Sequence, residues 1–76
     1  MARRLAIPRY YFHVRRGQIT VPDHGGIELA NTAGAAVEGA RRAQALANAE
    51  PLSEASATPG RIIVADDWDT LFEFLF

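Results

Sequence analysis

The first part of this chain contains two β-prone runs that are separated by a glycine. The first run, PRYYFHVRRG at residues 8–17, is rich in aromatic and β-branched side chains and ends at Gly17. Glycine adopts a positive φ at little cost, so the chain can reverse direction there and return through Ile19 and Val21. The sequence therefore predicts a β-hairpin that begins close to the N-terminus.

The side chains of the first predicted strand fall on two different faces, because successive residues of a strand point to opposite sides of the sheet. The apolar face, predicted to lie in the core, is made of Tyr10, Phe12 and Val14, and the amphipathic face is made of Tyr11, His13 and Arg15. The loop DHGG at residues 23–26 follows Pro22 and ends the second strand. We expect Ile27 and Leu29 to anchor the segment that comes next.

Residues 31–49 change to a helical pattern, and either Asn31 or Thr32 is a competent N-cap. The stripe that is predicted to face the sheet consists of Ala33, Ala36, Val37, Ala40, Ala43 and Ala47. Glu38 and Arg42 stand four residues apart in the favourable acid-first order, which predicts a pair on the solvated side. Small side chains on the buried stripe would let the helix approach the sheet closely.

A second β-hairpin is predicted after the helix. Residues 51–59 form a loop rich in Ser, Ala and Pro, without periodicity. Residues 61–65 form a β-branched strand, residues 66–69 form an acidic turn, and residues 70–76 form the last strand. One face of the last strand is predicted to carry Phe72, Phe74 and Phe76, and the other is predicted to carry Leu71, Glu73 and Leu75.

These elements predict an α+β fold of the order β-β-α-β-β. Two β-hairpins are joined by one helix, which packs on one face of a four-stranded antiparallel sheet whose strand order is left open. A chain of 76 residues has room for a single core. We therefore assign residues 8–76 to one small domain and residues 1–7 to an N-terminal extension. Self-association would help a chain this short, because its core supplies little net stability.

The composition argues against several classes of function. The chain has no cysteine, which removes disulfides, thiolate zinc sites and cysteine nucleophiles and favours a cytoplasmic location. The first residues lack the apolar stretch of a secretory signal, and no window approaches the ~20 apolar residues of a membrane span. The formal net charge of −1 gives no general attraction to nucleic acid or to an anionic membrane.

The order and spacing of several segments resemble a known family. The segments are PRYYFHVRRG at residues 8–17, DHGG at 23–26 with Glu28 and Leu29, the Ala/Arg-rich helix, IIV at 62–64 with Asp66, and the closing hydrophobic strand. Together they resemble the small bacterial family catalogued as domain of unknown function 6894. The local departures are Ala30-Asn31, where the family usually has Pro-Asp, and Asp69, at a turn position often given to glycine. The resemblance implies a compact β-β-α-β-β protein whose activity is not established.

A single helix can cover only one face of four strands, so the opposite face or an edge strand is the expected association surface. We predict a non-enzymatic protein-interaction or regulatory module that forms a homodimer or binds a protein partner, without a cofactor or an identifiable small-molecule substrate. Trp68 stands among three aspartates, and tryptophan is enriched among interface hot spots. The candidate interface residues are Tyr11, His13, Ile63, Trp68, Leu71 and Leu75.

A weak nucleic-acid-binding accessory protein is the first alternative. It would use Arg9, Arg15 and Arg16 as anion contacts, beside the aromatic side chains of the first strand. Alternation turns Tyr10 and Phe12 toward the helix and leaves only Tyr11 for stacking beside the arginines, so we expect nucleic acid to be a less suitable partner than protein.

A metal-dependent site is the second alternative. It would need the loop with Asp23 and His24 to meet the turn with Asp66, Asp67 and Asp69. The sequence carries no catalytic constellation, phosphate loop or metal-ligand spacing. We therefore predict no catalytic, cofactor-binding or metal-binding residue.

Overall fold

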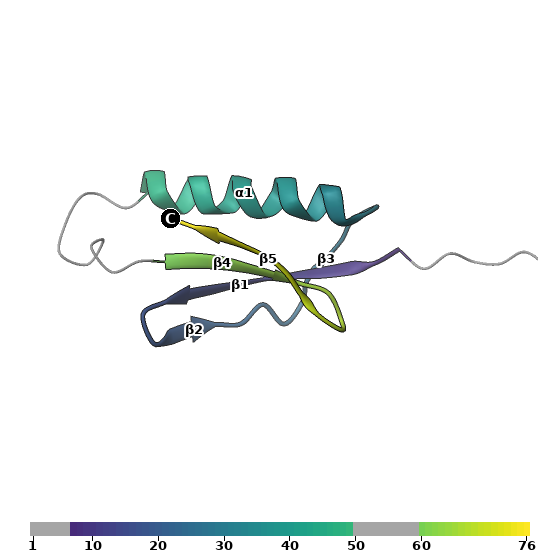
Figure 1. Cartoon of the computed structure of the whole chain (residues 1–76), viewed down its shortest axis with the longest axis horizontal. Coiled ribbons are helices and arrows are strands. Elements are labelled where there is room, and N and C mark those ends of the chain that lie inside the picture. The colour runs from purple at the N-terminus through teal and green to yellow at the C-terminus, as the bar shows by residue number, and fades with distance from the viewer. Residues whose placement is uncertain (1–6, 50–59) are drawn as a thin grey trace, which may run out of the picture.

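One antiparallel sheet and one helix form the two layers of the molecule (Figure 1). The computed structural model describes residues 7–49 and 60–76. Its elements, in chain order, are β1 (Arg9–Arg16), β2 (Ile19–Val21), β3 (Ile27–Glu28), α1 (Thr32–Ala49), β4 (Gly60–Ala65) and β5 (Thr70–Leu75). The α+β fold predicted from the sequence is confirmed. The predicted loop at 51–59 and most of the extension at 1–7 lie outside the described residues.

The strands follow the order β2-β1-β4-β5, so the two hairpins lie side by side through β1 and β4. All of these pairings are antiparallel. On its other edge, β1 pairs with β2 at one end and with β3 at the other. The sequence predicts Ile27 only as an anchor and does not predict β3, because two residues are too few to display an alternating pattern.

The core lies between α1 and the sheet. Its buried hydrophobic residues are Tyr10, Phe12, Ala35, Ala43, Ile62 and Val64. The predicted core positions of Tyr10 and Phe12 are therefore confirmed, and Val14, Ile27 and Leu29 pack against this cluster as partly buried residues.

Two local predictions about the chain path are also confirmed. Gly17 has a φ of 61° in the turn between β1 and β2, a conformation that residues with a Cβ rarely adopt. Asn31 is the N-cap of α1, since its Oδ1 accepts a hydrogen bond from the backbone N–H of Gly34 at 2.9 Å. The helix therefore starts after one of the two residues that the sequence offers as an N-cap.

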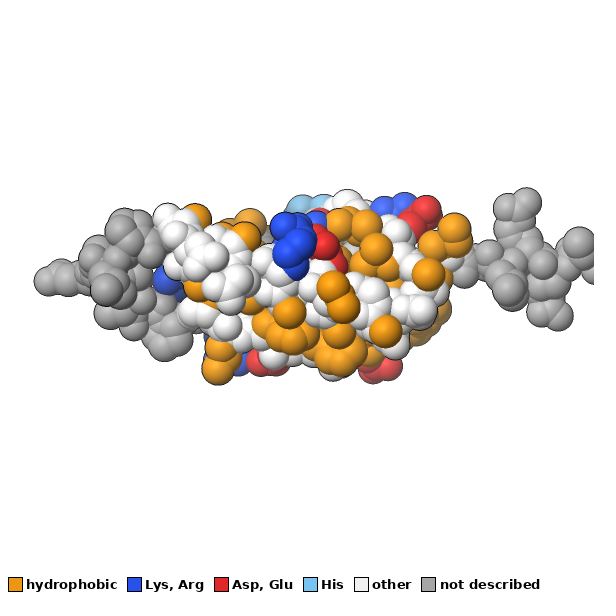
Figure 2. All heavy atoms as spheres, turned by 90° about the horizontal axis from the view of Figure 1, so that it is seen from above, with side chains coloured by type: hydrophobic (Ala, Val, Ile, Leu, Met, Phe, Trp, Pro, Cys, Tyr) orange, Lys and Arg blue, Asp and Glu red, His pale blue; other side chains and the backbone are white. Residues whose placement is uncertain are grey.

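The buried face of α1 differs from the predicted stripe. Its buried residues are Ala35, Gly39 and Ala43. The stripe residues that are exposed instead are Ala33, Val37, Ala40 and Ala47. Apolar side chains consequently spread over much of the surface on the helix side (Figure 2). Alanine occurs on every side of this helix and does not mark the buried face, whereas Gly39 lies against Val64 and Phe74, where no side chain would fit.

An irregularity between β4 and β5 changes the position of Leu71. The register shifts between Val64 and Ala65, which leaves Leu71 as the extra residue of the pairing. A bulge of this kind disturbs the alternation of side chains in the strand that carries it. Leu71 is partly buried and packs against the core cluster. Its predicted position on one face with Glu73 and Leu75 is therefore wrong.

Candidate interaction surface

The face of the sheet opposite α1 has a small apolar and aromatic centre. The register of β1 and β4 places Tyr11 opposite Ala65 and His13 opposite Ile63. All four residues are half-buried, and the rings of Tyr11 and His13 stack with centroids 6.3 Å apart. Among the described residues, no helix or strand packs on this face. We call it the uncovered face, and its residues are Tyr11, His13, Arg15, Arg61, Ile63, Ala65, Glu73 and Leu75.

Ion pairs stand at the border of this centre. Arg61 of β4 donates a hydrogen bond to Glu73 of β5 at 2.9 Å, and Arg9 of β1 donates one to Glu28 of β3 at 3.1 Å. These side chains are between 41% and 53% exposed, so the pairs contribute little to folding. An apolar and aromatic centre inside a charged border is the usual anatomy of a protein–protein interface.

The turn between β4 and β5 is joined to β1 and presents Trp68 to solvent. The hydroxyl of Tyr11 donates a hydrogen bond to Asp67 at 2.9 Å, and this bond raises the pKa of the Tyr11 phenol. The carboxylate of Asp66 accepts hydrogen bonds from the backbone N–H groups of Asp69 and Trp68, which lower the pKa of that carboxyl. The side chain of Trp68 remains 81% exposed.

A hollow of about 470 Å³ lies between this turn and the beginning of β1. The residues that line it are Ile7, Pro8, Arg9, Tyr11, Glu28, Asp66, Asp67 and Trp68. Ile7 is 59% exposed. The hollow thus leaves two apolar side chains, those of Ile7 and Trp68, in contact with water.

Most candidate interface residues lie on or beside the uncovered face. Those on the face are Tyr11, His13, Ile63 and Leu75, and Trp68 lies in the adjoining turn. Leu75 is 71% exposed at the edge of the face. Leu71 does not join them, because it packs against the core.

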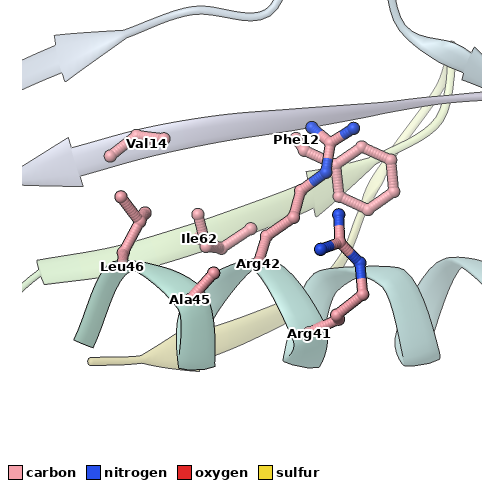
Figure 3. Close-up of a pocket in the computed structure, with 7 residues that line it drawn as sticks. All are labelled: Phe12, Val14, Arg41, Arg42, Ala45, Leu46 and Ile62. Atoms are coloured by element: carbon pink, nitrogen blue, oxygen red, sulfur yellow. The ribbon is translucent and has the colours of Figure 1, made fainter. Parts of the chain in front are cut away.

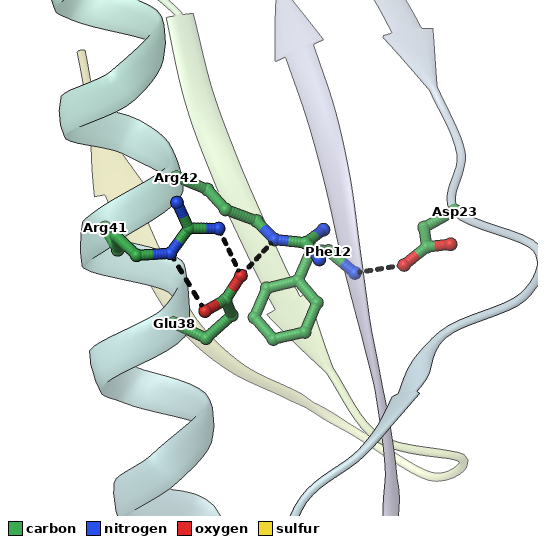
Figure 4. Close-up of polar contacts among 5 residues, drawn as sticks. All are labelled: Phe12, Asp23, Glu38, Arg41 and Arg42. Carbon is green, nitrogen blue, oxygen red and sulfur yellow. Dashed lines mark hydrogen bonds and ion pairs between the residues drawn. The ribbon is translucent and has the colours of Figure 1, made fainter.

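Asp23 has a structural role in this fold. Its Oδ2 accepts the backbone N–H of Phe12 at 3.1 Å (Figure 4), and its Oδ1 accepts those of Gly25 and Gly26. The carboxylate thereby fills the gap in backbone pairing along β1 between β2 and β3. Burial acts to raise the pKa of this carboxyl, but the three backbone hydrogen bonds together outweigh burial and lower the pKa.

His13 is bound to the same loop. Its Nδ1 accepts a hydrogen bond from the backbone N–H of Asp23 at 3.0 Å. Nothing in the local spacing of the sequence indicates this contact between β1 and the loop.

The structure does not assemble the metal site considered above from Asp23, His24, Asp66, Asp67 and Asp69. In the part of the chain that the structure describes, no three His, Cys, Asp or Glu side chains gather in a group that could hold a metal ion.

The three arginines considered as anion contacts do not form a single patch. Arg9 and Arg15 donate hydrogen bonds to backbone carbonyls at 2.6 Å and 3.1 Å. The guanidinium of Arg16 lies 5.0 Å from the centre of the Phe76 ring. Neighbouring residues of β1 point to opposite faces of the sheet, so Arg15 and Arg16 cannot hold the same stretch of phosphates.

A groove lies beside α1 on the helix-bearing side of the sheet (Figure 3). It has a volume of about 250 Å³ and is lined by Phe12, Val14, Arg41, Arg42, Ala45, Leu46 and Ile62. The helix packs mainly over β4 and β5, which leaves the β1 side of this face partly open. The sequence did not predict the groove, because Arg42 was expected on the solvated side of the helix.

An ion-pair network forms one wall of this groove (Figure 4). Arg41 donates to both carboxylate oxygens of Glu38, and Arg42 donates to one of them at 2.7 Å. These hydrogen bonds, from Arg41 first and then from Arg42, lower the pKa of Glu38 to about 2. The predicted pair of Glu38 and Arg42 therefore forms. Its predicted position is wrong, however, since the Arg42 guanidinium lies 4.4 Å from the centre of the Phe12 ring and the pair is partly buried.

The comparisons with known proteins bear on the fold and not on an activity. No helix within residues 7–49 and 60–76 has the length and apolar character needed to cross a membrane. No curated protein and no solved structure is significantly similar to this chain. A family model described as a domain of unknown function (DUF6894) matches residues 9–76, which is nearly the whole chain. The chain therefore belongs to the DUF6894 family, as its opening run and helix indicated.

Proposed function

We propose that this chain is a small, non-enzymatic protein-interaction or regulatory module that self-associates through the uncovered face of its sheet. The observation that best supports the proposal is the half-buried centre of that face, formed by Tyr11, His13, Ile63 and Ala65 inside a charged border. The proposal places the module in the cytoplasm, the setting that a cysteine-free sequence favours.

The energetics of a small core favour association. A single core in a chain of this length rarely supplies more than about 3–5 kcal/mol. Apolar surface that is removed from water contributes roughly 25 cal/mol per Å². A second copy seated on the uncovered face would bury Ile63 and both stacked rings, and binding to the folded state alone would stabilise that state by mass action.

The charges of the border suit a second copy as the occupant. In a two-fold dimer the same patch of each chain forms the contact. A charged group of one copy therefore faces the equivalent patch of the other copy. The uncovered face holds Arg61 and Glu73 side by side at 2.9 Å. Antiparallel placement of two such pairs brings Arg61 of each copy toward Glu73 of the other, without repulsion between like charges.

The test is the mass in solution, measured by light scattering after size exclusion. Ile63→Glu places a charge at the centre of the uncovered face. Val37→Glu is the matched control, because Val37 is 70% exposed on the outer side of α1. At high salt, which screens contacts between charged surfaces, we expect a dimer for the wild type and for Val37→Glu, and a monomer for Ile63→Glu.

Circular dichroism shows whether each variant keeps its fold, and Leu75→Glu gives a second variant at an exposed edge position. A wild type that stays monomeric at high micromolar concentration would overturn the proposal. Folded Ile63→Glu and Leu75→Glu variants that both remain dimeric would overturn it as well. A Val37→Glu variant that becomes monomeric would place the contact on the helix instead.

A further inference from the structure

Trp68 is a large apolar side chain for which the fold provides no cover. It stands at the tip of the turn between β4 and β5 and is 81% exposed. Asp66, Asp67 and Asp69 surround it in sequence. We call residues 66–69 the acidic turn. Contact between the apolar indole and water is unfavourable, and burial against a partner would remove it. Tryptophan is also among the commonest hot-spot residues of interfaces.

The groove beside α1 has the size and the lining to receive one large side chain. Its volume of about 250 Å³ lies below the roughly 300–1,000 Å³ of sites for drug-sized ligands. Phe12, Val14 and Ile62 from the sheet and Leu46 from the helix give it apolar walls (Figure 3). Val21, which pairs with Val14 on the adjacent strand, is 61% exposed and extends the apolar surface.

The charged wall of the groove is positive. Both charged residues that line the groove, Arg41 and Arg42, are positive. They share the carboxylate of Glu38, and Arg42 also interacts electrostatically with the Asp23 carboxylate, which is held by three backbone N–H groups outside the groove lining. The guanidinium of Arg42 stacks over Phe12 and is partly exposed, with a side-chain exposure of 30%. A second aromatic ring on the free side of this guanidinium would gain a further cation–π contact.

We propose that the acidic turn of one copy docks into the groove of another copy, with the Trp68 indole against Arg42 and the apolar walls. The carboxylates of the turn and the two arginines that line the groove are of opposite charge. The two surfaces do not meet within one chain, because the turn extends from the sheet on the side away from α1 (Figure 1) and none of its residues lines the groove.

This contact is independent of the proposed dimer. It joins two different patches, so it is heterologous and propagates from copy to copy, whereas the uncovered face pairs with itself. Trp68 also adjoins the uncovered face, so a test must separate the two contacts. We therefore use the Ile63→Glu background, in which the proposed dimer is absent.

Intrinsic fluorescence reports on this contact directly, since Trp68 is the only tryptophan of the chain. In the Ile63→Glu background at low salt, we expect the emission to shift to the blue and the mass to rise above a monomer as concentration increases. Salt should reverse both changes, because it screens the charges of partly exposed groups. Emission that stays at the wavelength of a solvated indole at every concentration overturns the proposal.

Charge reversal on each side supplies the specific test. Arg41 is 63% exposed and Asp69 is exposed, so Arg41→Glu and Asp69→Arg leave the core intact. Each variant alone should lose the blue shift, with an affinity at least about tenfold lower. A mixture of the two should recover the shift, because each offers the other a complementary partner. Retention of the shift by either variant alone, or failure of the mixture to recover it, overturns the proposal.

Discussion

Gly39 and Gly34 give a matched test of how closely α1 approaches the sheet. Replacing a helical glycine with alanine stabilises the helix by roughly 1 kcal/mol when the new methyl group has room. At Gly39 the added Cβ would stand 2.7 Å from Val64 Cγ2 and 2.8 Å from Phe74 Cε2. At Gly34 the nearest such atom is Asn31 Oδ1, at 3.7 Å, an ordinary contact. The same substitution therefore has opposite consequences at two positions of one helix.

The magnitude at Gly39 follows from two opposing effects. Val64 is fully buried and cannot move without disturbing β4, so the extra methyl group costs about 1–3 kcal/mol through overpacking. The gain in helix propensity, about 1 kcal/mol, offsets part of this cost. We expect Gly39→Ala to lower the free energy of unfolding by about 1 kcal/mol. Gly34→Ala should raise it by about 0.5–1 kcal/mol.

Urea unfolding followed by circular dichroism measures both changes, provided that the slope of the transition stays the same. The experiment compares the two variants with the wild type at one protein concentration, because association also shifts apparent stability. If Gly39→Ala stabilises the protein as much as Gly34→Ala does, the close packing of α1 against Val64 is refuted.

Three further changes test the local structure. Asp23→Ala removes the carboxylate that accepts three backbone N–H groups. It should lower the free energy of unfolding by about 2–3 kcal/mol in urea titrations, and a loss below the error of the titration would contradict its role. Asn31→Ala removes the cap of α1 and should cost about 0.5–2 kcal/mol in the same assay; an unchanged midpoint would argue against the cap. Glu38 has its pKa lowered from 4.5 to about 2, so its stabilising contribution is complete above the higher value and is lost as pH falls between the two. Thermal melts across that range should show a shallower acid loss for Glu38→Gln, and identical profiles for both proteins would contradict the assignment.

The sequence predicted the elements whose signals are local. The alternation of Tyr10 and Phe12 identified the core face of β1, and the positive φ at Gly17 followed from a glycine between two strands. Asn31, the cap of α1, was one of the two predicted candidates. These features depend on neighbouring residues alone, so one sequence suffices to find them.

Features that depend on distant contacts were not predictable in this way. The buried face of α1 is set by Gly39 against Val64, and an alanine-rich helix offers no contrast from which to read it. The bulge that moves Leu71 depends on the pairing of two strands. The same holds for Asp23, whose carboxylate completes the edge of β1, and for the groove, which requires the position of the helix over the sheet.

The positions of the candidate residues in the sheet were more predictable from the sequence than their contacts. Tyr11, His13 and Ile63 share one face because the strand period and the antiparallel register together decide it. The exposure of Trp68 required the structure, since a tryptophan in a turn can equally fold back onto its own domain. The structure was likewise needed to show the contacts of the three arginines. Arg9 and Arg15 donate hydrogen bonds to backbone carbonyls, and Arg16 lies over the Phe76 ring.

If two copies meet through the uncovered face, protons of one copy lie close to protons of the other. A sample that mixes isotope-labelled and unlabelled chains allows nuclear Overhauser effects to be filtered so that only signals between copies remain. We expect such signals between the Ile63 methyl groups of one copy and the Tyr11 and His13 rings of the other. Signals between copies that involve only α1, or none in a sample whose mass is that of a monomer, would contradict it.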